Sequence, residues 1–243
     1  MFLSIESVPL IIGAYLLGSV PTSYLAAKWS RGIDIRQHGA GHAGASSIWR
    51  ITPKKVSVPV MIFDFGKGIG IVALAHYLGM GKPEQIAVGL VAIIGHNWPI
   101  FLRFYGGRGI LTAMGVIVLW WSPWWPPWAV ITFLGGTALT LLGKGSPLPV
   151  LIGIAMLPLV SWGFGQPLAV TIGFLVLLLI IVIRRLTAPK SAEATSRSKK
   201  ELLVNRLLFD RDVREQETIL HIIPRKKRKA ECLPEEDEKQ REG

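Results

Sequence analysis

The sequence predicts an all-α integral membrane protein with seven transmembrane helices, an external N-terminus and a cytosolic C-terminal tail. Half of the 243 residues are hydrophobic and the mean hydropathy is +0.43, which is typical of membrane proteins. Seven apolar segments follow one another over residues 1–187, and the loops between them differ sharply in charge. Residues 188–243 are polar instead. We therefore expect two parts, a transmembrane domain over 1–187 and a cytosolic tail over 188–243.

The apolar segments approach the length that crosses the hydrocarbon core, which an α-helix spans with about 20 residues. The first follows an acidic residue, Glu6, and has no clear small-residue cleavage site, so we interpret it as a retained helix and not as a signal peptide. Pro21 is expected to kink this helix. The fourth segment has the length of a buried or re-entrant helix. The expected spans cover residues 8–27, 57–78, 85–102, 110–121, 128–142, 147–162 and 168–183.

Basic residues in the loops fix the expected orientation. With the N-terminus outside, the cytoplasmic loops hold nine Lys and Arg side chains, whereas the external loops hold Lys82 alone. Sixteen more basic residues follow from Arg184 onward. An excess of positive charge marks the cytoplasmic side of a membrane protein. The external loop over 121–128 contains four tryptophans, as expected of an aromatic belt at the membrane surface.

The distribution of charge and the cysteine count argue against nucleic-acid binding, an internal disulfide and a thiolate metal site. A net charge of +11 could indicate nucleic acid, but this charge lies in short loops and in the tail, not in a soluble basic domain. We therefore expect no nucleic-acid partner. Cys232 is the only cysteine, which excludes an internal disulfide and a cluster of thiolate ligands. No metal site and no cofactor are predicted.

A polar loop after the first span has the residues of an anion site. Three glycines, Gly39, Gly41 and Gly44, allow the backbone to turn and approach a ligand, and Arg36 and Arg50 add positive charge. Backbone N–H groups that converge in this way, together with arginine, bind phosphate oxygens. The alternative is a flexible cytoplasmic loop whose arginines only fix the orientation.

The second span contains two charged residues, Asp64 and Lys67. Each charge near the bilayer centre costs about 2.5–3.5 kcal/mol on insertion scales, so the pair requires a reason. A spacing of three places both on one helical face, where they can form a structural ion pair. The interpretation that we favour is that this face lines a polar pocket, in which Lys67 attracts an anionic substrate.

A second glycine loop follows the third span. Gly106, Gly107, Arg108 and Gly109 again combine an arginine with glycines, as in a backbone site for an oxyanion. His96 lies shortly before it and is a candidate general acid or base, or a hydrogen-bond donor to phosphate, although a lone histidine is more often structural. Together the two loops indicate a phosphate-containing substrate at the membrane surface.

The motifs over residues 15–186 resemble the PlsY family, bacterial seven-helix membrane enzymes that acylate glycerol 3-phosphate with acyl phosphate as donor. The resemblance implies a multi-pass protein of the bacterial inner membrane with a cytoplasmic active face, and a product, lysophosphatidic acid, for phospholipid biosynthesis. Its partners would be the two substrates and the lipid bilayer. The matching stretches are Tyr-Leu-Leu-Gly-Ser-Val-Pro (15–21), Asp-Ile-Arg-x-x-Gly (34–39) with Gly41, Gly44 and Arg50, Asp-x-x-Lys-Gly (64–68), Gly-His-x-x-Pro-x-Phe (95–101) and Gly-Gly-Arg-Gly (106–109).

The resemblance also assigns roles to individual residues. Ser46 and Ser47 stand where the family has Thr-Asn, and Ser146 matches a serine of a later motif, so all three are expected to bind substrate, as is Asp64. Arg108 takes the place of a lysine and keeps the charge with a wider donor fork. His42 replaces an asparagine and, with His96 and Lys67, is a predicted catalytic residue.

Several family positions have lost their polar groups. A serine is replaced by Ala40, and the closing His-x-x-Asn motif places Leu179 and Val182 where the family has its His and Asn. Two functions therefore remain open: a working acyltransferase with a rearranged site, which we favour, and a non-catalytic relative that keeps the fold and binds phosphate or lipid. A transporter is a weaker third possibility, since the sequence shows no internal repeat.

The tail contains one apolar stretch and one basic run. Leu203, Val204, Leu207 and Leu208 predict part of an amphipathic helix within residues 199–223. The basic run over 225–229 is expected to contact anionic lipid; the alternative is a solvated, disordered run. The sequence does not determine the oligomeric state.

Overall fold

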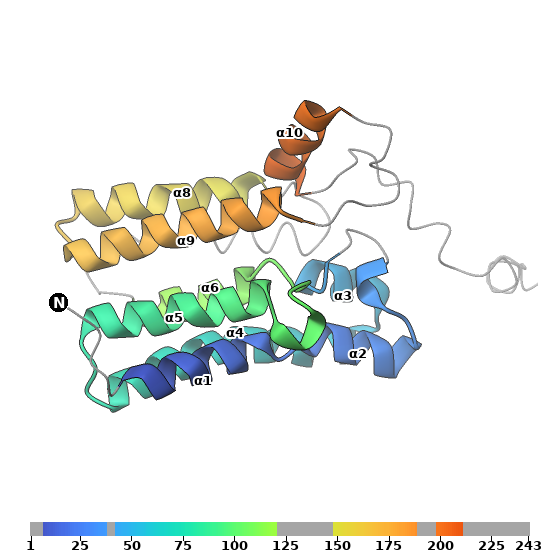
Figure 1. Ribbon diagram of the computed structural model, residues 1–243, viewed down its shortest axis with the longest axis horizontal. Coiled ribbons are helices and arrows are strands. Elements are labelled where there is room, and N and C mark those ends of the chain that lie inside the picture. Colours follow the sequence, from blue (N-terminus) through green and yellow to red (C-terminus); the bar gives the residue numbers. More distant parts are fainter. Residues whose placement is uncertain (1–6, 38–41, 121–147, 189–197, 211–243) are drawn as a thin grey trace, which may run out of the picture.

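The computed structural model describes residues 7–37, 42–120, 148–188 and 198–210. Within these ranges the chain is helical and contains no strand, which confirms the predicted all-α class. The long helices run nearly parallel in one elongated bundle (Figure 1). The helix expected over 128–142, Cys232 and the basic run over 225–229 lie outside the described residues.

The first predicted span is divided in two by Pro21. Helix α1 (Val8–Ser19) ends one turn before α2 (Thr22–Arg31) begins, and Val20 between them has an extended ψ of 115°. Proline has no backbone N–H and disfavours helical geometry in the residue before it. The predicted kink is therefore confirmed, in the form of a break.

Within the described ranges, five further helices belong to the bundle. Helix α5 is followed by the short 3₁₀ helix η3 (Ile100–Leu102), which completes the third predicted span. The four segments 8–31, 54–77, 82–102 and 168–186 are long and apolar enough to cross a membrane, whereas α6 and α8 are shorter apolar helices. The bounds are α4 (Lys54–Tyr77), α5 (Lys82–Asn97), α6 (Ile110–Trp120), α8 (Leu148–Gly163) and α9 (Leu168–Leu186).

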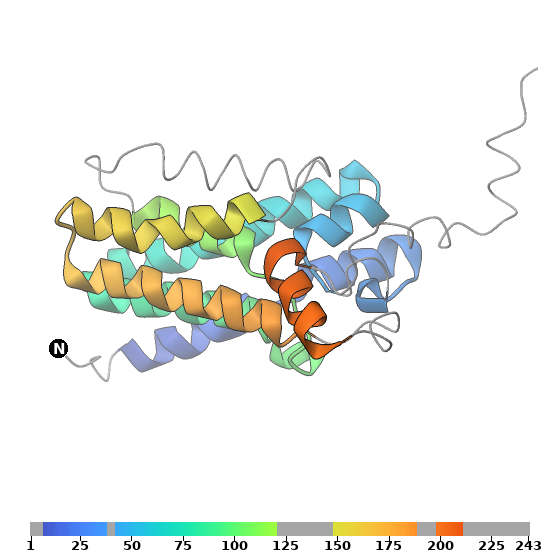
Figure 2. The ribbon, with the colours of Figure 1, turned by 90° about the horizontal axis from the view of Figure 1, so that it is seen from above.

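Small residues bring two pairs of helices into close contact. A Cβ atom on Gly18 of α1 would collide with the backbone of Ala92 of α5, and one on Gly95 would collide with Tyr15. A Cβ on Gly115 of α6 would meet the carbonyl of Phe65 of α4 in the same way. Membrane helices use small residues to pack closely, because lipid removes the hydrophobic drive between them. These contacts pack α1 against α5 and α4 against α6, and seen from above α8 and α9 lie side by side over these helices (Figure 2).

The outward faces of the bundle are apolar. Ile62, Leu159 and Leu168 are 65%, 60% and 71% exposed, as expected for side chains that face lipid. The loops alternate between the two ends of the bundle. The loop after α4 and the turn between α8 and α9 lie at one end, and the polar loops after α2 and η3 lie at the other, beside α3 (Ala45–Ile51) and α10 (Lys199–Phe209) (Figure 1).

Helix α10 accounts for part of the predicted amphipathic helix. Ser198 caps it by accepting a hydrogen bond from the N–H of Glu201 at 3.3 Å, a helix-start signal that the sequence contains. Leu202, Asn205 and Arg206 are buried, whereas Leu203 and Val204 of the predicted apolar stretch are each 46% exposed. Polar contacts with α9, described below, decide which face is buried.

Candidate active site

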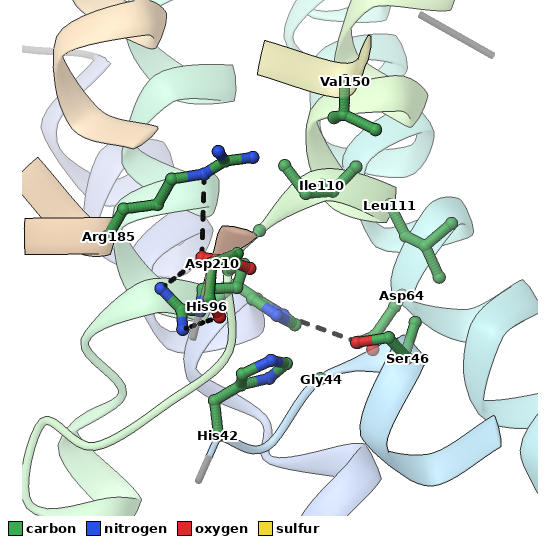
Figure 3. A pocket seen from close by; sticks show the side chains of 13 residues that line it. His42, Gly44, Ser46, Asp64, His96, Ile110, Leu111, Val150, Arg185 and Asp210 are labelled. Carbon is green, nitrogen blue, oxygen red and sulfur yellow. Dashed lines mark hydrogen bonds and ion pairs between the residues drawn. The ribbon is translucent and has the colours of Figure 1, made fainter. Parts of the chain in front are cut away.

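A cavity opens at the polar end of the bundle, where the two glycine loops meet residues of α3, α4, α5, α6, α8 and α9 and the end of α10. The space between its lining residues is about 570 Å³, open solvent at the mouth included. It brings together residues from both glycine loops with Asp64 of α4 and His96 of α5 (Figure 3). The predicted site residues that line it are His42, Gly44, Ser46, Asp64, His96, Arg108 and Gly109.

Asp64 and Lys67 form a buried ion pair on α4, with each side chain only 1% exposed. The Lys67 ammonium lies 2.8 Å from Asp64 Oδ1 and donates to Gly18 O at 3.1 Å; its Nζ also lies 2.9 Å from His96 Nδ1. An ammonium has three N–H donors, so these partners occupy all of them. Lys67 does not line the cavity, and its attraction of an anionic substrate stays a prediction.

The break at Pro21 supplies one of these partners. In a continuous helix the carbonyl of Gly18 would accept the N–H of Thr22, but that N–H bonds to Val20 O at 3.0 Å instead. Gly18 O is thereby available to Lys67. The hydroxyl of Thr22, at the start of α2, donates to Asp64 Oδ1 at 2.9 Å. The break therefore positions two contacts to the charged pair.

The contact with Lys67 determines the tautomer of His96. Because a charged ammonium can only donate, Nδ1 of His96 must accept, and the proton of the neutral ring lies on Nε2. That atom faces Gly107, since a Cβ placed on this glycine would collide with it. His96 is consequently a donor toward the second glycine loop, with its acceptor nitrogen already used.

One oxygen of Asp64 remains without a partner. Its Oδ1 receives Lys67 and Thr22, whereas Oδ2 is buried and makes no hydrogen bond to any described residue. A buried carboxylate oxygen without a donor is costly, because its desolvation is not compensated. The carboxylate lines the cavity, so a hydroxyl bound there would supply the missing donor.

The second glycine loop packs against α5. Gly107 has no room for a side chain between His96 and the carbonyl of Ala43, and Gly109 has a φ of +69° that favours glycine. The N–H of Gly107 donates to His96 O at 3.1 Å. This bond corrects the expectation of a backbone oxyanion site at Gly107, because its N–H is used inside the protein. Gly106 is buried beside Pro99 and does not line the cavity.

Arg184 holds this loop from α9. Its Nε donates to Gly107 O at 2.9 Å and its Nη2 to Gly106 O at 2.8 Å, and its guanidinium carbon lies 5.8 Å from the ring centroid of Trp98. The side chain is 3% exposed. Sequence reasoning missed this residue because it counted Arg184 only as an orientation charge.

Arg108 reaches the cavity together with two residues that sequence reasoning did not single out, Arg185 and Asp210. Nη1 of Arg108 lies 2.6 Å from Asp210 Oδ1, and Nε of Arg185 lies 3.7 Å from the same oxygen (Figure 3). All three residues are mostly buried. They make an arginine-rich wall at which one carboxylate from the tail is already bound.

The first glycine loop contributes His42, Ser46 and Gly44 to the cavity. His42 is buried, and its Nδ1 lies 3.4 Å from Ser47 Oγ. Ser47 is also buried but does not line the cavity. Gly44 precedes α3 in an extended conformation, and its N–H donates to His42 O at 3.1 Å. Gly39, Gly41 and Ser146 lie outside the described residues.

Arg36 and Arg50 do not line the cavity. Arg36 donates to its neighbour Asp34 through Nε at 3.0 Å and Nη2 at 2.7 Å. These hydrogen bonds lower the pKa of Asp34 and raise the pKa of Arg36. A local carboxylate thus takes the guanidinium that was expected to bind phosphate. Arg50 lies half-buried in the last turn of α3.

The end of α9 differs from the closing motif of the family. Leu179 is 57% exposed on the outer face of the bundle and Val182 is half-buried, and neither lines the cavity. In the next turn of α9, Arg185 lines the cavity and Arg184 donates to the second glycine loop. Among the described residues no group of His, Cys, Asp and Glu has the arrangement of a metal site.

Comparisons with known proteins identify the family of this chain. The family model for glycerol-3-phosphate acyltransferase matches residues 8–190. Glycerol-3-phosphate acyltransferase 4 of Dehalococcoides mccartyi (strain CBDB1) is 42% identical over 211 residues, which cover 84% of this chain and 89% of that protein. The glycerol-3-phosphate acyltransferase of Synechococcus sp. (strain CC9902) is 34% identical over 169 residues, covering 69% and 84% of the two chains.

The fold is also similar to solved structures. The crystal structure of PlsY (YgiH), an integral membrane glycerol 3-phosphate acyltransferase, in its glycerol 3-phosphate form superposes with a TM-score of 0.67 at 28% identity, covering 90% of this chain and all of that chain. Its lysophosphatidic acid form gives a TM-score of 0.64 at 29% identity, covering 89% and 99%. From the match over 8–190, the relatives and these structures, the chain belongs to the glycerol-3-phosphate acyltransferase family of integral membrane proteins.

Proposed function

We propose that this protein moves an acyl group from acyl phosphate to a hydroxyl of glycerol 3-phosphate, giving lysophosphatidic acid and phosphate. The observation that carries the proposal is the pairing, in one cavity, of Arg108 and Arg185 with the unpartnered oxygen of Asp64. The arginines attract phosphate oxygens, and the carboxylate accepts from a hydroxyl. A phosphorylated alcohol has both groups.

In the proposed reaction the glycerol oxygen attacks the acyl carbonyl carbon, the bond from that carbon to the phosphate oxygen breaks, and inorganic phosphate leaves. The hydroxyl proton passes to Asp64 Oδ2 and then to the departing phosphate. Acyl phosphate is an activated donor, so orientation and charge neutralisation supply much of the rate. Lys67, His96 and Thr22 are assigned the role of holding the carboxylate, and His42 stays a predicted catalytic residue.

The apolar part of the cavity suits the acyl chain. Ile110 and Leu111 at the start of α6 and Val150 of α8 line the wall beside Arg108 and Arg185. An acyl phosphate carries an apolar chain, and this wall offers apolar contacts to it. We propose that the acyl chain follows α6 and α8 into the bilayer, while the arginines hold the phosphate of glycerol 3-phosphate.

The function is tested with purified protein in lipid. We expect conversion of glycerol 3-phosphate and an acyl phosphate to lysophosphatidic acid without added metal or nucleotide, measured with radiolabelled glycerol 3-phosphate. Folding is checked on the same sample by its thermal transition. A folded protein that binds phosphate but forms no product would contradict the catalytic proposal and favour the non-catalytic relative.

We further propose seven spans in the bacterial inner membrane, with the N-terminus outside and the cavity facing the cytoplasm. The charge segregation of the loops and the alternation of the described loops between two ends support this orientation. With Cys232 replaced by Ser, single cysteines at Gln37 and Lys82, both exposed, should react with a membrane-impermeant maleimide from opposite sides. Labelling from the same side would refute the arrangement.

A further inference from the structure

Asp210 occupies the donors with which Arg108 would grip a phosphate. Its carboxylate lies 2.6 Å from Arg108 Nη1, and its backbone carbonyl accepts from Nη2 at 3.2 Å. Two parallel N–H groups on an arginine fork are what a phosphate group uses for bidentate binding. Both terminal nitrogens of Arg108 are therefore engaged by one residue of the tail, 102 positions away in the sequence.

The fold delivers Asp210 to this place. It ends α10 with a φ of 56°, a left-handed conformation that aspartate adopts more readily than most residues. Two exchanged contacts fix α10 on α9: Arg185 Nη1 donates to Leu207 O at 2.7 Å, and Arg206 Nη1 donates to Leu186 O at 2.9 Å. The carboxylate is thus presented at the arginine wall by a docked helix.

The fit between Asp210 and Arg108 is incomplete. Among the described residues, Nε and Nη1 of Arg108 and Oδ1 of Asp210 are buried without a well-aligned hydrogen bond, although the ion pair is short. A phosphate group has more oxygens and more charge than a carboxylate, so it can satisfy the arginine donors that Asp210 leaves unpaired.

From this geometry we infer that Asp210 is an intramolecular ligand of the substrate-phosphate site, which phosphate must displace, and that it thereby sets the affinity for the anionic substrate. The inference rests on the proposed function, because it places a substrate phosphate at Arg108. A tethered ligand acts at a high effective concentration. Free anion binds only to those molecules in which the tail has left the site. Its apparent affinity therefore equals the intrinsic affinity multiplied by the fraction of such molecules.

The test uses the full chain and the variant Asp210→Asn. Asparagine keeps the shape, the backbone carbonyl and the tolerance for the left-handed conformation, so only the charge is removed. The matched control is Glu201→Gln, which removes an exposed negative charge from the first turn of the same helix. Asp210→Ser is a second variant without the charge, and the thermal transition of each protein verifies folding.

We expect Asp210→Asn and Asp210→Ser to bind inorganic phosphate ~10-fold more tightly than the natural protein, with a matching fall in KM for glycerol 3-phosphate and no fall in kcat. Glu201→Gln should bind phosphate as the natural protein does. Unchanged or weaker phosphate binding in both Asp210 variants would overturn the inference, and so would a fall in kcat at constant KM, since Asp210 would then serve the reaction itself.

The variant Arg108→Gln separates this inference from the function on which it rests. If the natural protein and the Asp210 variants bind phosphate equally and Arg108→Gln abolishes binding, the phosphate site stands and the competing role of Asp210 is wrong. If Arg108→Gln binds phosphate as the natural protein does, the anion lies elsewhere, and the proposed function at this cavity fails together with the inference.

Discussion

Asp64→Asn is expected to lower kcat by about 10²-fold or more, the usual contribution of a positioned proton acceptor. Asparagine has nearly the same shape and still accepts from Lys67 and Thr22, but it cannot take a proton. KM for glycerol 3-phosphate should change far less, because the phosphate contacts lie on Arg108 and Arg185. Initial rates at saturating acyl phosphate measure both constants.

A double variant distinguishes proton transfer from ion pairing. Asp64→Asn leaves the Lys67 ammonium buried without its counter-charge, which by itself destabilises a protein. Lys67→Met removes that charge and fills a similar volume, so Asp64→Asn with Lys67→Met should recover thermal stability while kcat stays low. Recovery of kcat to within about tenfold of the natural protein would show that Asp64 serves only as the partner of Lys67.

Arg108→Gln is expected to raise KM for glycerol 3-phosphate by roughly one to two orders of magnitude, because hydrogen bonds to a charged group are worth about 1.5–3 kcal/mol. Arg108→Lys keeps the positive charge but loses the forked pair of N–H donors. Its KM should therefore lie between those of the natural protein and Arg108→Gln. The measurement is KM at fixed acyl phosphate, together with the dissociation constant for inorganic phosphate.

Arg103→Gln is the matched control, because Arg103 lies in the same connection between α5 and α6 but is exposed and does not line the cavity. It removes the same charge from the same part of the protein. Equal effects of the Arg103 and Arg108 variants would mean that only the net charge of this end matters, and that Arg108 makes no specific contact with the substrate.

The residues that sequence reasoning placed well carry local signals. A proline within an apolar segment predicts the break at Pro21, and two charges three residues apart within a span predict the pairing of Asp64 with Lys67. Glycines that flank an arginine drew attention to Arg108, which lines the cavity. Each of these inferences needed only the chain within one or two turns.

The remaining features depend on contacts between distant segments. Arg184 binds two backbone carbonyls, and Asp210 meets Arg108 through the docking of α10; no pattern near either residue indicates its partner. For Arg36 the missed contact is a local one. The sequence suggested that this side chain binds phosphate, but it forms an ion pair with Asp34, two residues before it. Lys67 was placed on the same helical face as Asp64, but its other two contacts are with Gly18 of α1 and His96 of α5.

The bond between Arg184 and the loop at Gly106 and Gly107 has a consequence for the order of synthesis. Chains emerge from the ribosome N-terminus first, and α9 follows this loop by more than sixty residues. Until α9 has been inserted, the two carbonyls lack the Arg184 donors, and the loop that carries Arg108 is held only by its contacts with α5 and the first glycine loop. A ribosome-bound chain that ends before α9 would lack both Arg184 and Arg185, so we expect activity only once α9 is in place.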